Sequence, residues 1–109
     1  MFAKVDRFDE TQQQLALFAK SLSHPARIAI VQLLAAQKTC ISGDIAAALP
    51  LSRATVSQHL QELKKVGLIK GEIDGQHVNY CLDVSRWKLL VTCFGEFFTQ
   101  TDPPNDCTC

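Results

Sequence analysis

The chain changes its apolar period between residues 52 and 82, and this change limits its fold more than any other feature. Over residues 52–67 apolar side chains recur at helical spacing, from a serine that can cap a helix to a glycine that can end one. The apolar positions of this helix are Val56, Leu60 and Leu63. Two strand-like runs, 68–73 and 77–82, then flank Asp74-Gly75, a strong signal for a tight hairpin. The sequence therefore predicts one helix that leads directly into a two-stranded hairpin.

Four more helices are predicted around this unit. The first covers residues 10–22, and the second covers 23–36, where a polar cap is followed by a proline. A short third helix over 42–49 starts at a serine cap, and Pro50 ends it. A tight turn joins it to the basic helix that follows, which is the arrangement of a helix-turn-helix. The last helix covers residues 84–100.

The composition is typical of a single globular domain. Of its 109 residues, 47% are apolar and 20% are charged. We expect a domain over residues 1–102 and a flexible tail over 103–109. No apolar run is long enough to span a membrane, and acids near the N-terminus differ from a signal peptide, so we expect a cytoplasmic protein with no membrane partner. An enzyme is not expected, because the sequence holds no phosphate loop, nucleophile elbow or pair of catalytic carboxylates.

The net charge of zero conceals a basic segment in the middle of the chain. Residues 51–70 carry four basic side chains and one acid, a net charge of +3. Residues 71–109 carry two basic side chains and six acids, a net charge of −4. A basic segment of this kind suits a polyanionic partner at one surface.

The outward face of the basic helix carries polar side chains that suit DNA. A helix fits the major groove, where Arg53 is suited to pair with guanine and Gln58 with adenine. The lysines further along are placed to contact phosphates, which position a helix without reading sequence. A solvated polar face on a structural helix is the alternative interpretation. The candidate DNA-binding residues are Ser52, Arg53, Thr55, Ser57, Gln58, Gln61, Lys64, Lys65, Lys70 and His77.

Three segments together resemble the arsenic-repressor (ArsR/SmtB) family of winged-helix regulators. The segment SRATVSQHLQELKKVGLIKGEIDGQHVNYCL is similar to the family's recognition helix and wing. LSHPARIAIVQLL resembles its second helix, and CISGDIAAALPLS resembles its third helix and turn, so the match covers roughly residues 10–100. The resemblance implies a dimeric repressor with the 52–67 helix in the major groove, the hairpin as a wing, and release of DNA when a ligand binds. The wing tip, residues 74–77, lacks the arginine expected for insertion into the minor groove.

Five cysteines leave the nature of the ligand open. In a winged helix the short strand after the second helix pairs with the hairpin, which would bring Cys40 beside Cys81. Two facing thiols can hold a soft metal or an arsenite-like metalloid, or oxidise to a disulfide, and Cys107 and Cys109 could add a chelating arm. The alternative is that Cys40, Cys81 and Cys93 are small core residues.

Two ligand patterns of the family are incomplete in this chain. Its arsenic sensors often carry Cys-x-Cys at the start of the third helix, whereas this chain has Cys40-Ile41-Ser42. The zinc site of other members uses paired Asp/His and His/Glu ligands on the last helix, where this chain has no histidine and one acid, Glu96. The three histidines are too scattered to form a catalytic set, and His59 is interpreted as a structural hydrogen-bonding residue.

The first and last helices carry more apolar side chains than a small domain can bury. Such surfaces usually mark subunit contacts, and a two-fold dimer would place two recognition helices roughly 34 Å apart. A ligand pocket is the competing interpretation. The candidate dimer-interface residues are Leu15, Phe18, Trp87, Leu90, Phe94 and Phe97.

Taken together, these features predict a mainly α protein with a small β-hairpin, a dimeric winged helix-turn-helix of about five helices. The function that follows is a homodimeric transcriptional repressor that binds a double-stranded DNA operator and is released by a thiol-bound metal or arsenite-like metalloid. A redox-responsive or ligand-independent winged-helix regulator is one alternative. A winged-helix protein–protein adaptor that never meets DNA is another.

Overall fold

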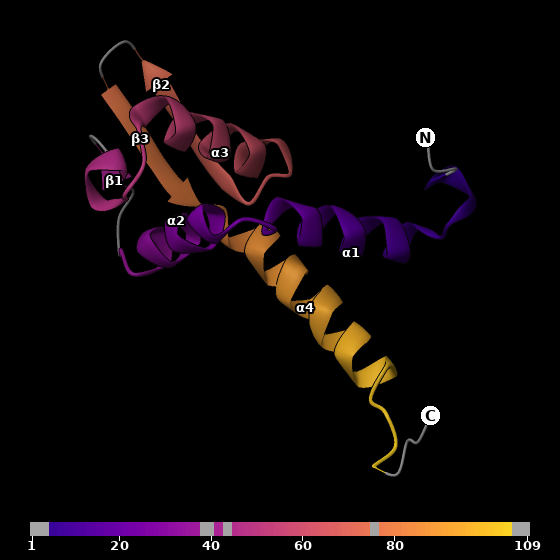
Figure 1. The fold of residues 1–109 in the computed structure, drawn as a ribbon. Helices are drawn as coiled ribbons and strands as arrows, with labels where there is room; N and C mark the ends of the chain where they lie inside the picture. The colour runs from indigo at the N-terminus through magenta and orange to yellow at the C-terminus, as the bar shows by residue number, and fades with distance from the viewer. Residues whose placement is uncertain (1–4, 38–40, 43–44, 75–76, 106–109) are drawn as a thin grey trace.

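The computed structural model describes residues 5–37, 41–42, 45–74 and 77–105, and Figure 1 shows the arrangement of their elements. The helices are α1 (Glu10–Ser21), α2 (Pro25–Ala35), α3 (Arg53–Lys65) and α4 (Val84–Gln100). Two short 3₁₀ helices are η1 (Val5–Arg7) and η2 (Ile45–Ala48), and the strands are β1 (Ile41–Ser42), β2 (Ile69–Asp74) and β3 (His77–Leu82). In the described part of the chain, no helix is long and apolar enough to cross a membrane.

The strands form one antiparallel sheet in the order β1-β3-β2. Ile41 is paired with Tyr80 and Ile69 with Leu82, so β3 lies between the short strand and the other arm of the hairpin. This confirms the prediction that the strand after the second helix pairs with the hairpin. Leu68, expected at the start of the hairpin, instead completes the end of α3, where its amide donates to the Leu63 carbonyl at 3.1 Å.

Side-chain caps set where the helices begin. The Ser52 hydroxyl accepts a hydrogen bond from the Thr55 amide at 3.3 Å, which confirms the predicted start of α3. Asp83 caps α4 by accepting from the Arg86 amide at 3.1 Å. The cap of α2 is His24, one residue later than the first polar residue of the predicted cap, and its Nδ1 accepts from the Ala26 amide at 2.9 Å.

The predicted third helix is wrong in kind and in length. Among the residues of this stretch that the structure describes, 42 and 45–49, the helical segment is η2, a four-residue 3₁₀ helix, and Ser42 belongs to β1 rather than capping a helix. The reason is competition for the backbone: Ser42 pairs with Asn79 on β3, and Pro50 removes the amide that a longer helix would need. The described residues therefore hold four α-helices and two 3₁₀ helices rather than five helices.

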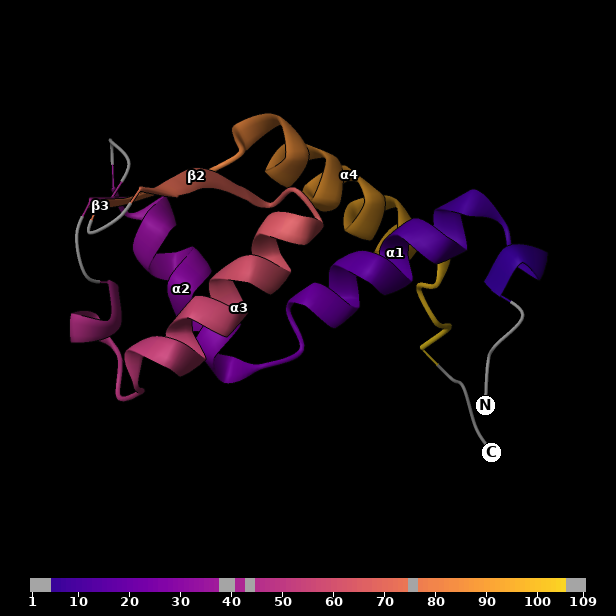
Figure 2. The same cartoon turned by 90° about the horizontal axis from the view of Figure 1, so that it is seen from above.

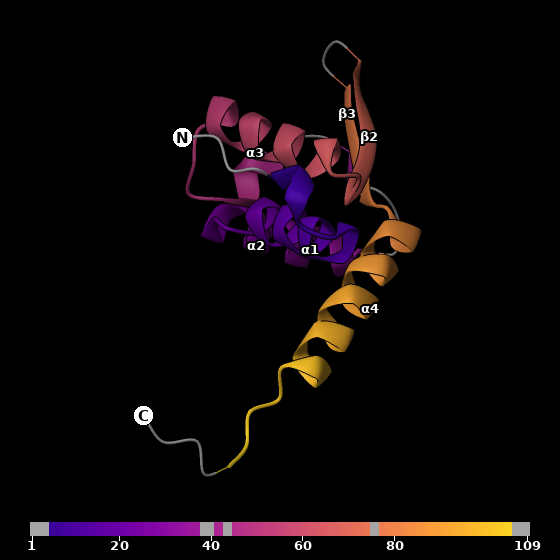
Figure 3. The ribbon, with the colours of Figure 1, turned by 90° about the vertical axis from the view of Figure 1, so that its right-hand side faces the viewer.

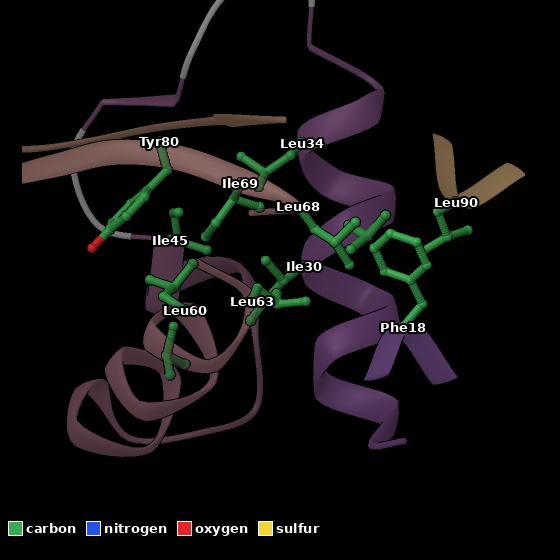
Figure 4. Close-up of a cluster of buried hydrophobic side chains, with 12 residues drawn as sticks. Phe18, Ile30, Leu34, Ile45, Leu60, Leu63, Leu68, Ile69, Tyr80 and Leu90 are labelled. Atoms are coloured by element: carbon green, nitrogen blue, oxygen red, sulfur yellow. The ribbon is translucent and has the colours of Figure 1, made fainter. Parts of the chain in front are cut away.

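One apolar core joins α1, α2, α3, α4 and the sheet (Figure 4). Phe18 of α1 and Leu90 of α4 are 0% and 5% exposed and pack against it from one side. Both were expected on the dimer surface, and this expectation is corrected: their side chains are buried within a single chain. The fully buried large side chains of the core are Phe18, Ile30, Leu63, Leu68 and Ile69.

α3 and the hairpin lie on one side of the molecule (Figure 3). Figure 3 shows α3 lying over α2, with the hairpin rising beside α3 and α4 running away in the opposite direction. α1 and α4 contact each other where α4 begins. The face formed by α3 and the hairpin is therefore separate from the outer half of α4.

Candidate nucleic-acid interface

α3 turns its apolar side inward and a polar side outward. Val56, Leu60 and Leu63 are buried, as the spacing predicted. The opposite side leaves Arg53, Gln58 and Gln61 exposed, with Ser57 and Thr55 half-buried at its edges. Figure 2 shows that α3 is at the outside of the molecule along most of its length, not covered by another helix. An α-helix presented in this way can enter the major groove of DNA.

The first turn of α3 is held by two hydroxyl groups. The Ser52 hydroxyl donates to the Thr55 hydroxyl at 3.0 Å, in addition to accepting from the Thr55 amide. Two of the three predicted DNA-binding hydroxyls, those of Ser52 and Thr55, therefore already have partners within the cap. The positive end of the helix dipole lies at this turn, next to the exposed Arg53, and favours a nearby phosphate.

The predicted phosphate-contacting lysines have different surroundings. Lys64 reaches the hairpin, where its ammonium donates to the carbonyl of Gly71 at 2.7 Å. Lys65 forms a 3.2 Å ion pair with Glu62, which is exposed and therefore weak. Lys70 is exposed on β2. Lys64 thus links α3 to β2 of the hairpin, a contact that the sequence did not predict.

Gly71 is required where Lys64 meets the wing. Its φ is +150°, and a Cβ there would lie 2.0 Å from the Asn79 carbonyl oxygen on the neighbouring strand. Any other residue would therefore push β2 and β3 apart. Of the other predicted site residues in the hairpin, His77 begins β3, where it is paired with Asp74.

The inner side of α3 is tied to the start of α2 by a polar cluster of His24, Arg27 and His59. Arg27 Nε donates to His59 Nδ1 at 3.1 Å, and the two imidazole rings lie 4.4 Å apart. Arg27 also donates through Nη1 to the Lys20 carbonyl at 3.3 Å. Burial, followed by the charges of His24 and Arg27, lowers the pKa of His59. His59 is thus a hydrogen-bonding residue, as expected, and the cluster fixes how α3 sits on α2.

Only part of the predicted thiol site falls within the described residues. Cys81 is half-buried on β3 and is disulfide-bonded. Cys93 is free, half-buried and packed against the core, as the core interpretation expects. Cys40, Cys107 and Cys109 lie outside the described residues. Among the residues that the structure describes, no group of three or more His, Cys, Asp or Glu side chains is placed to hold a metal ion.

The exposed apolar side chains of α1 and α4 differ from the predicted set. Leu15, Trp87 and Phe94 are half-buried, the latter two against the core, and Phe97 is exposed. The predicted stripe on α4 is therefore largely the side that packs inward. Other apolar side chains of these two helices remain exposed, and we call this exposed set the α1–α4 apolar surface: Leu17, Val84, Leu89, Val91, Phe97 and Phe98.

Comparison with known proteins places this geometry among transcriptional regulators. Residues 22–72 match the model of a family described as a helix-turn-helix domain. The chain is 37% identical over 70 residues to a transcriptional repressor SmtB homolog of Synechocystis, a match covering 64% of this chain and 52% of that relative's length.

Two further matches cover more of their counterparts. A cadmium resistance transcriptional regulatory protein CadC homolog of Staphylococcus aureus is 34% identical over 89 residues, which covers 82% of this chain and 74% of that protein. A solved structure titled as a possible transcriptional regulator for arsenical resistance has a TM-score of 0.62 and 32% identity, over 78% of this chain and 83% of that one.

Proposed function

The chain belongs to the ArsR/SmtB family of winged-helix DNA-binding transcriptional regulators, and on that premise we propose that it is a homodimeric, thiol-responsive repressor acting on DNA in the cytoplasm. The observation that supports operator binding best is the two-sided recognition helix. Its inner side is fixed by the core and by the Arg27–His59 hydrogen bond, while Arg53, Gln58 and Gln61 are exposed on the other side.

We assign base reading and phosphate contact to different parts of this surface. Arginine pairs bidentately with guanine and glutamine with adenine, so Arg53 and Gln58 are the proposed base-reading residues. Lys65 and Lys70 are the proposed phosphate contacts, because both are exposed lysines near the end of α3. Lys64 holds the wing to α3 and contributes its charge to the same region.

Homodimerisation is proposed through the α1–α4 apolar surface. Side chains such as Val84 and Phe98 are exposed in the single chain, and burying them against a second copy is favourable. A two-fold dimer would present two copies of α3 to successive turns of the major groove, about 34 Å apart.

The proposed inducer is a soft metal or an arsenite-like metalloid bound by thiolates. Ile41 is paired with Tyr80, and the neighbours of these two residues in the sequence are Cys40 and Cys81. A trivalent centre bound by this pair would take its third thiolate from Cys107 or Cys109. The β1 strand precedes η2, which leads into α3, so a ligand held at β3 could shift the recognition helix.

A second candidate is a redox-responsive repressor, and the disulfide state of Cys81 favours it. In this alternative Cys40 and Cys81 are the reacting pair. Their two thiols lose two protons and two electrons to hydrogen peroxide, which is reduced to two water molecules while the S–S bond forms. Oxidation and arsenite binding would use the same two sulfur atoms and exclude each other.

DNA binding is tested first with the wild-type protein. Selection from a random duplex library should yield a preferred sequence whose affinity falls steeply with salt, as phosphate neutralisation requires. Absence of any preferred duplex would favour the adaptor and refute the repressor.

The two inducers are separated on that selected duplex. Arsenite should release the reduced wild-type protein and the Cys93→Ser control, but not Cys81→Ser or Cys40→Ser. If a peroxide releases the wild type and arsenite does not, the redox candidate replaces the metalloid one. Arsenite-driven release that persists in Cys81→Ser would exclude the β1–β3 site.

A further inference from the structure

The end of α3 is joined to the start of α4 by two hydrogen bonds. The Asp83 amide donates to the Leu68 carbonyl at 2.9 Å, just after α3 ends. Arg86 Nε donates to the carbonyl of Val66 at 2.9 Å, and Val66 is the C-terminal cap residue of α3. A positive side chain at a helix C-terminus also interacts favourably with the helix dipole. The first turn of α4 is thus bound directly to the last turn of α3.

The same guanidinium contacts α1. Its central carbon lies 5.1 Å from the centroid of the Phe18 ring, a cation–π arrangement with a fully buried aromatic side chain. The Arg86 side chain therefore touches α1 and α3 while its backbone belongs to α4. Arg86 thus joins both helices of the α1–α4 apolar surface to the end of α3.

Gly67 leaves the space that this contact needs. Its φ is +81°, and a Cβ at this position would lie 3.3 Å from Arg86 Nε and 3.4 Å from Arg86 Cγ. The backbone amide of Arg86 is held in turn by the Asp83 carboxylate. The backbone of Arg86 is therefore fixed by the cap of α4, and its guanidinium is fixed by the end of α3.

We propose that Arg86 is a positioning residue that sets the angle of α3 relative to the dimerisation helices, and thereby the half-site spacing that the dimer accepts. This inference rests on the proposed dimeric DNA binding. A dimer gains from its second half-site only if both recognition helices are presented at the correct separation. Loosening the Arg86 contact should therefore affect paired half-sites more than a single one.

The test uses the full-length protein and the duplex selected by the wild type, prepared in three forms. One form keeps both half-sites, one has a scrambled half-site, and one has the half-sites moved apart by a base pair. Arg86→Met keeps the aliphatic stem and removes the donor to Val66. Lys88→Met, which removes an exposed positive charge on the same helix, is the matched control.

Arg86→Met should bind the paired duplex about tenfold more weakly than the wild type, because a charged hydrogen bond that orients α3 is lost. Its affinity for the scrambled duplex and its dimer dissociation constant should stay within about twofold of the wild type. The wild type should lose affinity when the half-sites are moved apart, and Arg86→Met should lose less. Lys88→Met should keep the spacing dependence of the wild type.

Other results overturn the proposal. If Arg86→Met loses the same affinity for paired and single half-sites, or if its affinity depends on half-site spacing as that of the wild type does, then Arg86 is only a structural contact. If Arg86→Met does not fold, Arg86→Lys takes its place, and unfolding of both would likewise make the role structural. A wild type that selects no duplex would refute the repressor itself, whereas a selecting wild type with unaffected variants would refute this inference alone.

Discussion

Phe98→Ala tests whether the exposed apolar side chains of α4 form a dimer interface. Phe98 is 63% exposed in the single chain, the largest exposure among the aromatic side chains described. A phenylalanine side chain presents about 200 Å², so about 130 Å² of Phe98 remains in water. At about 25 cal/mol per Å², complete burial of that area is worth about 3 kcal/mol per copy.

In the proposed two-fold dimer the substitution acts twice, once in each copy. If half of the exposed area of Phe98 is covered in the dimer, the two copies together lose about 3 kcal/mol on truncation, which makes the dimer roughly a hundredfold weaker. Sedimentation velocity over a concentration series measures this change. Ile28→Ala is the matched control, because Ile28 is 41% exposed but lies on α2.

Two outcomes would contradict a dimer built on the α1–α4 apolar surface. A wild type that sediments as a monomer at micromolar concentration would remove the dimer. A wild-type dimer that Phe98→Ala leaves unchanged, or that Ile28→Ala weakens as much, would place the interface on another surface. The expected pattern is a weaker dimer for Phe98→Ala alone, with DNA binding recovered at higher protein concentration.

Three further predictions concern stability and the wing. Leu63→Ala should lower the free energy of unfolding by about 2–5 kcal/mol in urea titrations, because it opens a cavity at a fully buried position of α3. Gly71→Ala should weaken DNA binding and shift the amide NMR signals of the hairpin, because its Cβ would collide with the Asn79 carbonyl. Since the pKa of His59 lies below its ordinary value of 6.5, the unfolded chain binds more protons between the two pKa values. The contribution of neutral His59 to the free energy of unfolding should therefore be fully present above pH 6.5 and be lost as the pH drops through the folded-state pKa. Urea titrations at several pH values measure this loss, which should be smaller in His59→Gln.

Local signals were sufficient for the recognition helix and for α4. Ser52 and Asp83 cap these helices with their own side chains, and the residues that follow have one clear helical period. The predicted last helix has the same bounds as α4. Caps and periods act between residues a few positions apart, so they can be read from the sequence directly.

Contacts between distant residues were not predictable in the same way. The apolar stripe of α4 runs along the helix, and the part of it that meets the core depends on how the other helices pack, so Leu90 was expected at the surface, whereas Phe97 of the same stripe is the exposed one. Arg27 and His59 are 32 positions apart, and their hydrogen bond depends on how α2 packs on α3. Lys64 was expected to contact a phosphate. Its hydrogen bond to the Gly71 carbonyl depends on where the hairpin lies beside α3, which the spacing of residues within the helix does not reveal.

Gln58→Ala tests most directly whether the exposed side of α3 reads bases. On the selected duplex this variant should lose about 1–3 kcal/mol of binding free energy, and on a random duplex it should bind like the wild type. Lys70→Ala is the comparison: it should weaken both duplexes alike and reduce the salt slope by about 0.9. An equal loss on both duplexes for Gln58→Ala would contradict base reading by α3.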